Sequence, residues 1–185
     1  MSQSQKMRSA LSKYVIPNLI ANGFVGKYPH YKKIYDDRIE LLVFQTHSWG
    51  NAFTVEVSTV FLTPRKNGNN FLNEGFKAIE DATVWDTRQR YRLDGMFDGW
   101  FYYTDVYKHI LPNGSKPMPF YEAVGESKAK DSTPDKDAVL VQKADSDIYR
   151  KICELVNSQM PNTFEWWDTF NKNNKVKKVW TKRFN

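Results

Sequence analysis

The sequence predicts an α+β domain in which an antiparallel sheet of about five strands is covered on one face by N- and C-terminal helices. Two stretches, 38–46 and 52–62, alternate in hydropathy with the period of two that half-buried strands require. Two others, 4–22 and 148–160, repeat their apolar residues at the spacing of an amphipathic helix. Helices at the two ends of the chain with strands between them predict a sheet against which the helices pack.

The two alternating stretches form a hairpin that organises the rest of the chain. In the second strand Phe53, Val55 and Val57 alternate with polar residues and are expected to face the core. The connection over 47–51 contains Gly50 and Asn51, which tolerate the positive φ of a tight turn. The pairing is therefore expected to be antiparallel.

Composition favours one domain over 1–185. A chain of 185 residues can bury a core without disulfides, and the single Cys153 cannot form an internal one. The start of the chain lacks the apolar segment of a signal peptide, and no apolar run is long enough for a membrane span. We therefore expect a soluble protein of the cytoplasm, without membrane partners.

The net charge of +6 is unevenly distributed. Residues 1–35 carry six Lys or Arg and no acid, and residues 172–185 carry six more and no acid. The intervening part holds 15 basic and 21 acidic residues. The high isoelectric point therefore does not by itself indicate a basic nucleic-acid-binding face.

The N-terminal helix is expected to be interrupted. Pro17 lies inside the apolar pattern, where it removes a backbone hydrogen bond and predicts a kink or two short helices. Gly23 is typical of the left-handed residue that ends a helix. A short strand is expected over 31–35.

Beyond the hairpin the pattern is mixed. Residues 64–70 form a turn cluster, and strand-forming residues return at 90–93 and 100–107. The segment 112–137 gathers Pro, Gly, Ser and charge and is expected to be a mobile loop.

The C-terminal part predicts two helices. Asp145 or Ser146 is expected to cap the first, and Pro161 is expected to end it. Asn162 and Glu165 have the spacing of a capping box for a second helix that ends near Phe170. The basic C-terminal tail, 172–185, is expected to dock on the acidic middle of the chain; the alternative is that it binds nucleic acid.

The order of several short motifs resembles a bacterial family known as domain of unknown function 4304. The likeness covers about residues 7–107 and rests on Asn22-Gly23-Phe24, Phe44-Gln45, Trp49-Gly50, Phe53-Thr54-Val55, Arg92-Leu93 and Asp98-Gly99-Trp100-Phe101. The resemblance implies a bacterial source and an α+β fold. It implies no functional residues.

His47 and Asp98 are the catalytic candidates. The three histidines His30, His47 and His109 lack metal-ligand spacing, but His47 stands at a strand end where a rigid scaffold can present it. Asp98 could act with Asp94 in acid-base chemistry. The alternative is that all of them are turn or surface residues. No metal or nucleotide signature is present, so we expect no metal site and no cofactor.

Arg88, Arg90 and Arg92 are the strongest polar group, because alternate residues of a strand share one face. Together with Gln45 and Trp49 they are candidates for binding a phosphate or an acidic partner. The alternative is a solvated sheet face with cross-strand partners such as Glu40 or Glu56.

Two further groups have structural and functional interpretations. Trp85, Trp100, Trp166 and Trp167 could stack on nucleic-acid bases, or they could be packing residues. Cys153 lies on the apolar stripe of its helix, which favours a buried inert thiol over a nucleophile.

These observations favour a non-enzymatic cytoplasmic binding or accessory protein whose partner is a protein or a small anionic ligand. An enzyme acting on an anionic or phosphorylated substrate through the arginines, with His47 or Asp98, is the alternative. A further alternative is weak nucleic-acid binding through the tail.

Overall fold

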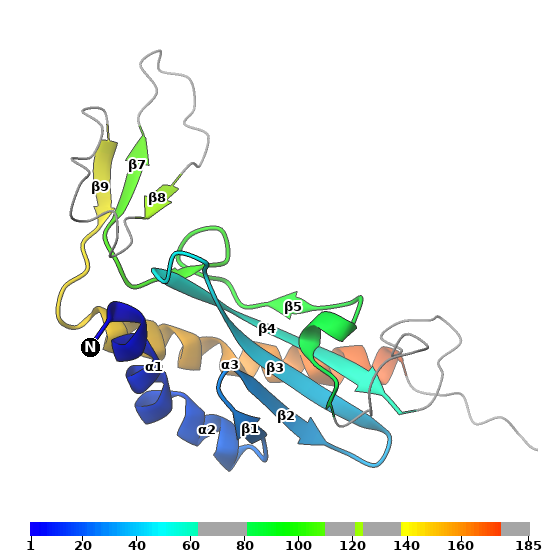
Figure 1. Ribbon diagram of the computed structural model, residues 1–185. Coiled ribbons are helices and arrows are strands. Elements are labelled where there is room, and N and C mark those ends of the chain that lie inside the picture. The colour runs from blue at the N-terminus through cyan, green and yellow to red at the C-terminus, as the bar shows by residue number, and fades with distance from the viewer. Residues whose placement is uncertain (63–80, 110–120, 124–137, 175–185) are drawn as a thin grey trace, which may run out of the picture.

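The computed structural model describes residues 1–62, 81–109, 121–123 and 138–174 and has an α+β fold (Figure 1). The main sheet is antiparallel and six-stranded, with the order β1-β2-β3-β4-β5 and with β6 also paired to β4. Its strands are β1 (Val25–Lys27), β2 (His30–Ile34), β3 (Arg38–Thr46), β4 (Ala52–Phe61), β5 (Tyr91–Arg92) and β6 (Phe101–Tyr102).

The N-terminal helix is broken where the sequence predicts. Helix α1 (Gln3–Tyr14) begins at Ser2, whose side chain accepts from the Gln5 backbone in a capping box. Helix α2 (Ile16–Ala21) starts after Val15 and carries Pro17 in its first turn, where a missing N–H costs no helical hydrogen bond. Gly23, with φ of 86°, ends it.

The predicted hairpin is present as β3 and β4. The register pairs Leu42 with Val57 and Phe44 with Val55, so these side chains share one face of the sheet. The connection lies at 47–51, and Gly50 adopts φ of 66° in it.

Helices α1, α2 and α3 (Ile148–Asn173) cover this face of the sheet, which we call the helix face (Figure 1). Phe53, Val55 and Val57 are buried in the main core, as predicted. The opposite, outer face carries a smaller cluster in which Ile39 and Leu41 pack with Val84 of the 3₁₀ helix η2 (Val84–Asp86). Both faces of β3 are therefore buried over part of their length.

Helix α3 corrects the prediction of two C-terminal helices. It runs without a break through Pro161, and its N-cap is Asp147 rather than Asp145 or Ser146. Val156 before the proline and Trp167 after it are both buried, so packing on the sheet offsets the lost hydrogen bond. Asn162 and Glu165 lie inside the helix and form no capping box.

A second sheet of three antiparallel strands, in the order β8-β7-β9, projects away from the helix layer (Figure 1). It contains β7 (Val106–His109), β8 (Tyr121–Ala123) and β9 (Ala138–Gln142). The run 100–107 is thus divided between two sheets, and three residues of the expected loop at 112–137 form β8. The rest of that loop, the turn cluster at 64–70 and the tail from 175 lie outside the described residues.

Among the helices in the described part of the chain, none has the length and apolarity needed to cross a membrane.

Candidate functional site

A pocket of about 250 Å³ lies where the start of α1 meets the β3–β4 turn. Helix α1 contributes Arg8 and Ser4, the residues before β2 contribute Tyr28, and the turn contributes His47 and Ser48. The pocket therefore joins the chain's first helix to the turn in which the sequence places its histidine candidate.

Arg8 is the cation of this pocket. Its guanidinium carbon lies 4.7 Å from the centroid of the Tyr28 ring, which is a cation–π contact. The Tyr28 hydroxyl shares a hydrogen bond of 3.0 Å with the Thr46 hydroxyl, and its ring stacks on Phe44 at 5.9 Å. Among the described residues, no carboxylate pairs with Arg8. A positioned guanidinium is thus left with its hydrogen-bond donors available.

His47 is held in a defined orientation. Its Nδ1 accepts a hydrogen bond of 3.3 Å from the Trp49 backbone N–H, so in the neutral ring the proton is assigned to Nε2. The ring meets Trp49 edge-on at 5.4 Å and Trp100 edge-on at 5.0 Å. His47 thus lines the pocket with Nδ1 engaged and Nε2–H as its remaining donor.

The rest of the lining is neutral. Met7 and Phe53 are buried at the base, and the Tyr103 hydroxyl donates to the Gly50 carbonyl at 2.7 Å, which fixes the turn. Among the described residues that line the pocket, none is an aspartate or glutamate. With one guanidinium, one imidazole and several hydroxyls, the arrangement can bind an anion but offers no base–nucleophile pair in hydrogen-bond contact.

Arg90 and Arg92 lie elsewhere, on the outer face, and only Arg92 belongs to a strand, so the predicted row of three arginines along one strand is not formed. Glu56, which is 4% exposed, accepts from Arg90 Nη1 at 3.3 Å and from both Nε and Nη2 of Arg92, with Nε at 3.0 Å. The cross-strand partner that the sequence analysis names as an alternative is therefore present. Arg88 is exposed and forms no ion pair with a described residue.

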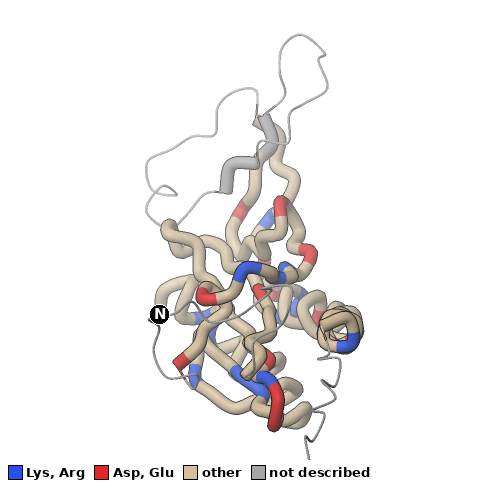
Figure 2. Tube along the Cα trace, turned by 90° about the vertical axis from the view of Figure 1, so that its right-hand side faces the viewer, with Lys and Arg blue, Asp and Glu red and all other residues tan. Residues whose placement is uncertain are grey.

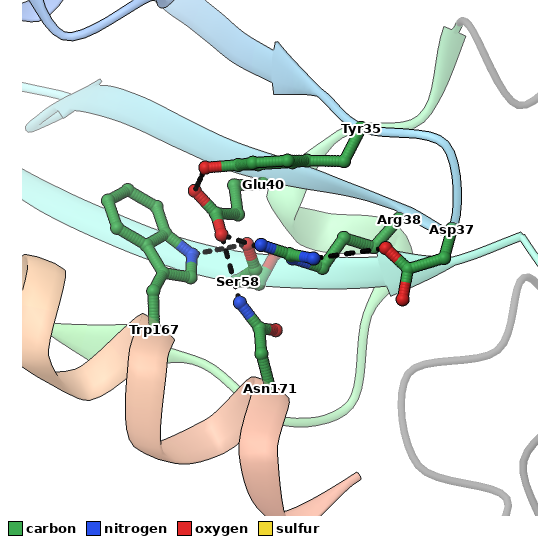
Figure 3. A network of polar contacts seen from close by, with 7 residues as sticks. All are labelled: Tyr35, Asp37, Arg38, Glu40, Ser58, Trp167 and Asn171. Atoms are coloured by element: carbon green, nitrogen blue, oxygen red, sulfur yellow. Dashed lines mark hydrogen bonds and ion pairs between the residues drawn. The ribbon is translucent and has the colours of Figure 1, made fainter. Parts of the chain in front are cut away.

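Glu40, the other possible partner, binds different groups on the helix face (Figure 3). Its carboxylate accepts from the Tyr35 hydroxyl at 3.1 Å, from Arg38 Nε at 3.3 Å and from Asn171 Nδ2 at 2.9 Å. The Asn171 contact ties the end of α3 to the sheet. Glu40 is 5% exposed, and both of its carboxylate oxygens accept hydrogen bonds within this structural network.

The remaining candidates are not gathered in the pocket. Asp98 is exposed in a turn with φ of 48°, directly before Gly99. Trp49 is 56% exposed and packs beside His47, and Gln45 pairs across the hairpin with Thr54 on the outer face. Within the described ranges, no cluster of three His, Cys, Asp or Glu side chains could hold a metal ion.

The tryptophans and Cys153 have mainly structural roles. Trp167 is buried and donates to the Ser58 carbonyl at 3.0 Å, and Trp166 stacks on Phe170 at 4.9 Å. Cys153 is buried, and burial raises the pKa of its thiol to about 12, which leaves it unreactive. Trp85 is exposed, and Trp100 is partly exposed and contacts His47.

Arg8 and Tyr28 are the pocket residues that sequence reasoning missed. The signal that could have found them is the first 35 residues, which hold six cations and no acid. A segment with no internal carboxylates leaves its cations to find partners elsewhere or to bind ligands. No local sequence pattern, however, indicates that Arg8 lies beside the hairpin turn.

The family described as Domain of unknown function (DUF4304) matches residues 15–110, just over half of the chain. The search of the curated proteins and the search of the solved structures return no match. Arg8 lies before the matched region, whereas Tyr28 and the β3–β4 turn lie within it.

Proposed function

The chain belongs to the DUF4304 family, and from that premise we propose that it is a non-enzymatic binding protein whose site is the pocket between α1 and the β3–β4 turn. The ligand is a small molecule that carries a carboxylate or phosphate group. Arg8 and the Nε2–H of His47 bind the anionic group, and the side chains at the base of the pocket contact its uncharged part.

The observation that carries this proposal is the charge of the lining. In the described part of the chain, Arg8 stacks on Tyr28 without a carboxylate partner, and no acidic residue lines the pocket. A guanidinium positioned by a ring keeps its planar fork of donors for a carboxylate or phosphate. The pocket therefore favours an anion over a neutral or cationic ligand.

The size of the pocket supports a small ligand. Its volume of about 250 Å³ falls below the roughly 300–1,000 Å³ of pockets that enclose drug-sized molecules. We therefore propose a compact carboxylate or phosphate monoester rather than a nucleotide.

The enzymatic alternative has less support. It requires the arginines to bind an anion beside His47 or Asp98, but His47 lines the pocket at α1 whereas Arg90 and Arg92 do not, and Asp98 is exposed in a turn. The nucleic-acid alternative depends on the tail, most of which lies outside the described residues. Both are weaker proposals than anion binding at the pocket.

We also propose a bacterial, cytoplasmic setting. The single buried Cys153 is compatible with a reducing compartment, in which disulfides are rare. The bacterial source rests on the family resemblance alone.

Thermal unfolding tests the proposed function. A panel of small carboxylates and phosphate monoesters, with inorganic phosphate included, is screened for a rise in melting temperature. A ligand at about a hundred times its dissociation constant stabilises the native state by about 2.7 kcal/mol. At least one anion is expected to raise the melting temperature, and Arg8→Gln is expected to abolish that rise.

Lys6→Gln is the matched control, because it removes one exposed cation from the same helix without touching the pocket. This variant should respond to the ligand as the unmodified protein does. If Arg8→Gln retains the full response, or if no anion in the panel stabilises the protein, the proposed function is wrong.

A further inference from the structure

The outer face of the sheet carries a charged and aromatic strip made of Glu56, Arg90, Arg92 and Trp100. The strip lies at the sheet edge, because β5 and β6 both pair with β4 on the side away from β3. Glu56 is buried, whereas the side chains of Arg90 and Arg92 are 41% and 43% exposed. A buried anion thus fixes two cations that remain open to solvent.

The two guanidiniums have hydrogen-bonding capacity left over. Each carries five N–H donors, and the bonds to Glu56 use one nitrogen of Arg90 and two of Arg92. Both Arg92 bonds go to the same oxygen, Oε1, so the outer edge of that guanidinium stays available. One carboxylate also balances only one of the two charges. Two residues before Arg90 in the chain, Arg88 is exposed and has no ion-pair partner among the described residues.

Trp100 positions Arg92 from the other side. The guanidinium carbon lies 5.8 Å from the centroid of the Trp100 ring, and that ring in turn contacts His47. A Cβ at Gly99 would lie 2.8 Å from Arg92 Cδ, so the glycine makes room for the arginine stem. Arginine and tryptophan are the residue types that most often dominate protein interfaces.

We propose that this strip docks an acidic segment of a partner protein, whose carboxylates pair with the outer edges of Arg90 and Arg92 and with Arg88. The excess positive charge of the strip is the complement of such a segment. Because Glu56 and Trp100 already hold two of the arginines, docking orders few side chains, and its entropy cost is small.

Asp94 and Asp98 limit the extent of the basic surface around the strip, which disfavours a long nucleic-acid backbone as the occupant. Asp94 and Asp98 lie in the turn between β5 and β6, and each helps burial to raise the pKa of a nearby tyrosine, Tyr91 and Tyr102 respectively. Figure 2 shows basic and acidic positions interspersed over the described body. A phosphate backbone is bound by a continuous basic surface, whereas a short acidic segment needs only the strip.

Fluorescence anisotropy with a labelled oligoglutamate peptide at low salt tests the proposal. The unmodified protein is expected to bind the peptide. Arg90→Gln, which leaves Glu56 paired with Arg92, is expected to weaken binding about fivefold, the equivalent of one exposed ion pair. Arg88→Gln is expected to weaken it to a similar extent.

A second variant, designed to keep the fold intact, tests the strip as a whole. Glu56→Gln combined with Arg90→Gln and Arg92→Gln replaces the charged group by neutral amides, so no buried charge is left unpaired. It removes one net positive charge, as does the control Lys143→Gln at an exposed site outside the strip. The triple variant should lose binding, and the control should retain it.

Three results would overturn the proposal. The first is that oligoglutamate fails to bind the unmodified protein. The second is that it binds the triple variant as tightly as the unmodified protein. The third is that a labelled oligothymidine binds more tightly than oligoglutamate and loses binding in the same variants. Arg8→Gln, which disables the anion pocket, should bind oligoglutamate normally, so the two proposals can fail separately.

Discussion

Glu40 and Glu56 are the buried carboxylates of the hairpin, and they lie on opposite faces of the sheet. Each is compensated by arginine: Arg38 for Glu40, and Arg90 with Arg92 for Glu56. Removing one partner of a buried pair leaves an uncompensated charge that costs several kcal/mol. These arginines therefore have a structural role whether or not they also bind a ligand.

His30 is a half-buried histidine whose environment changes its titration. Burial lowers the pKa of its imidazole below the ordinary value of 6.5, and its ring meets Trp85 edge-on at 5.2 Å. It lines a second pocket of about 310 Å³ together with Lys27, Lys32 and Asp81. Folding therefore favours the neutral form of His30.

Stability should fall with acidification because of His30. Its folded-state pKa lies below the unfolded value, so its contribution is fully present above about pH 6.5 and is lost as the pH falls from there toward the folded pKa. His30→Gln should show a shallower decline of the unfolding free energy over this window. Urea denaturation at a series of pH values measures it.

Trp85→Ala exposes the His30 ring and should raise its pKa toward the ordinary value, as followed by NMR titration. Trp49→Ala, which removes a tryptophan beside a different histidine, is the control and should leave the His30 titration unchanged. An unchanged His30 pKa in Trp85→Ala would show that the tryptophan does not cause the shift.

At the scale of elements, helix α3 shows how packing overrides a local stop signal. Pro161 is exposed, so its ring contributes little to the core, yet buried residues flank it on both sides. The helix therefore carries a missing backbone hydrogen bond at this point.

Pro161→Ala should stabilise the protein by about 1 kcal/mol, because the restored hydrogen bond outweighs the greater freedom of the unfolded chain. Thermal denaturation measures the change. Asn162→Ala is the comparison: inside a helix it should be nearly neutral, whereas a true N-cap would lose about 1 kcal/mol. Destabilisation by Pro161→Ala would mean that a bend at the proline is needed to place Trp167 on the sheet.

At the scale of the whole molecule, the two sheets differ in how deeply their apolar side chains are buried. Val57 is fully buried beneath the helices, whereas Val141 on β9 is 41% exposed in the projecting sheet. The same substitution should therefore have different effects in the two sheets.

Val57→Asp should prevent folding or cost more than about 4 kcal/mol, since it buries an unpaired carboxylate. Val141→Asp should change stability by less than about 1 kcal/mol, because the charge stays in water. Circular dichroism melts compare them. A cooperative melt of Val57→Asp near that of the unmodified protein would contradict the assignment of this face to the core.

Part of the fold could be predicted from the sequence because it depends on neighbouring residues. The strand alternation assigned Phe53, Val55 and Val57 to the core, and Pro17 and Gly23 marked the break and the end of the N-terminal helices. These patterns work within a few residues, where backbone geometry and side-chain direction are fixed by the local conformation.

The candidate site and the role of the arginines depend on contacts that local patterns do not encode. Glu56 meets Arg90 and Arg92 across separations of 34 and 36 residues, and Arg8 of the first helix lines the same pocket as His47 of the hairpin turn. Strand register and helix docking decide such contacts, and both are set by burial over the entire core. The sequence by itself determined the central hairpin, the broken N-terminal helix and the core face of β4. The tertiary structure alone decided that α3 continues through Pro161 and which charges meet, because each depends on what the packing of the core brings together.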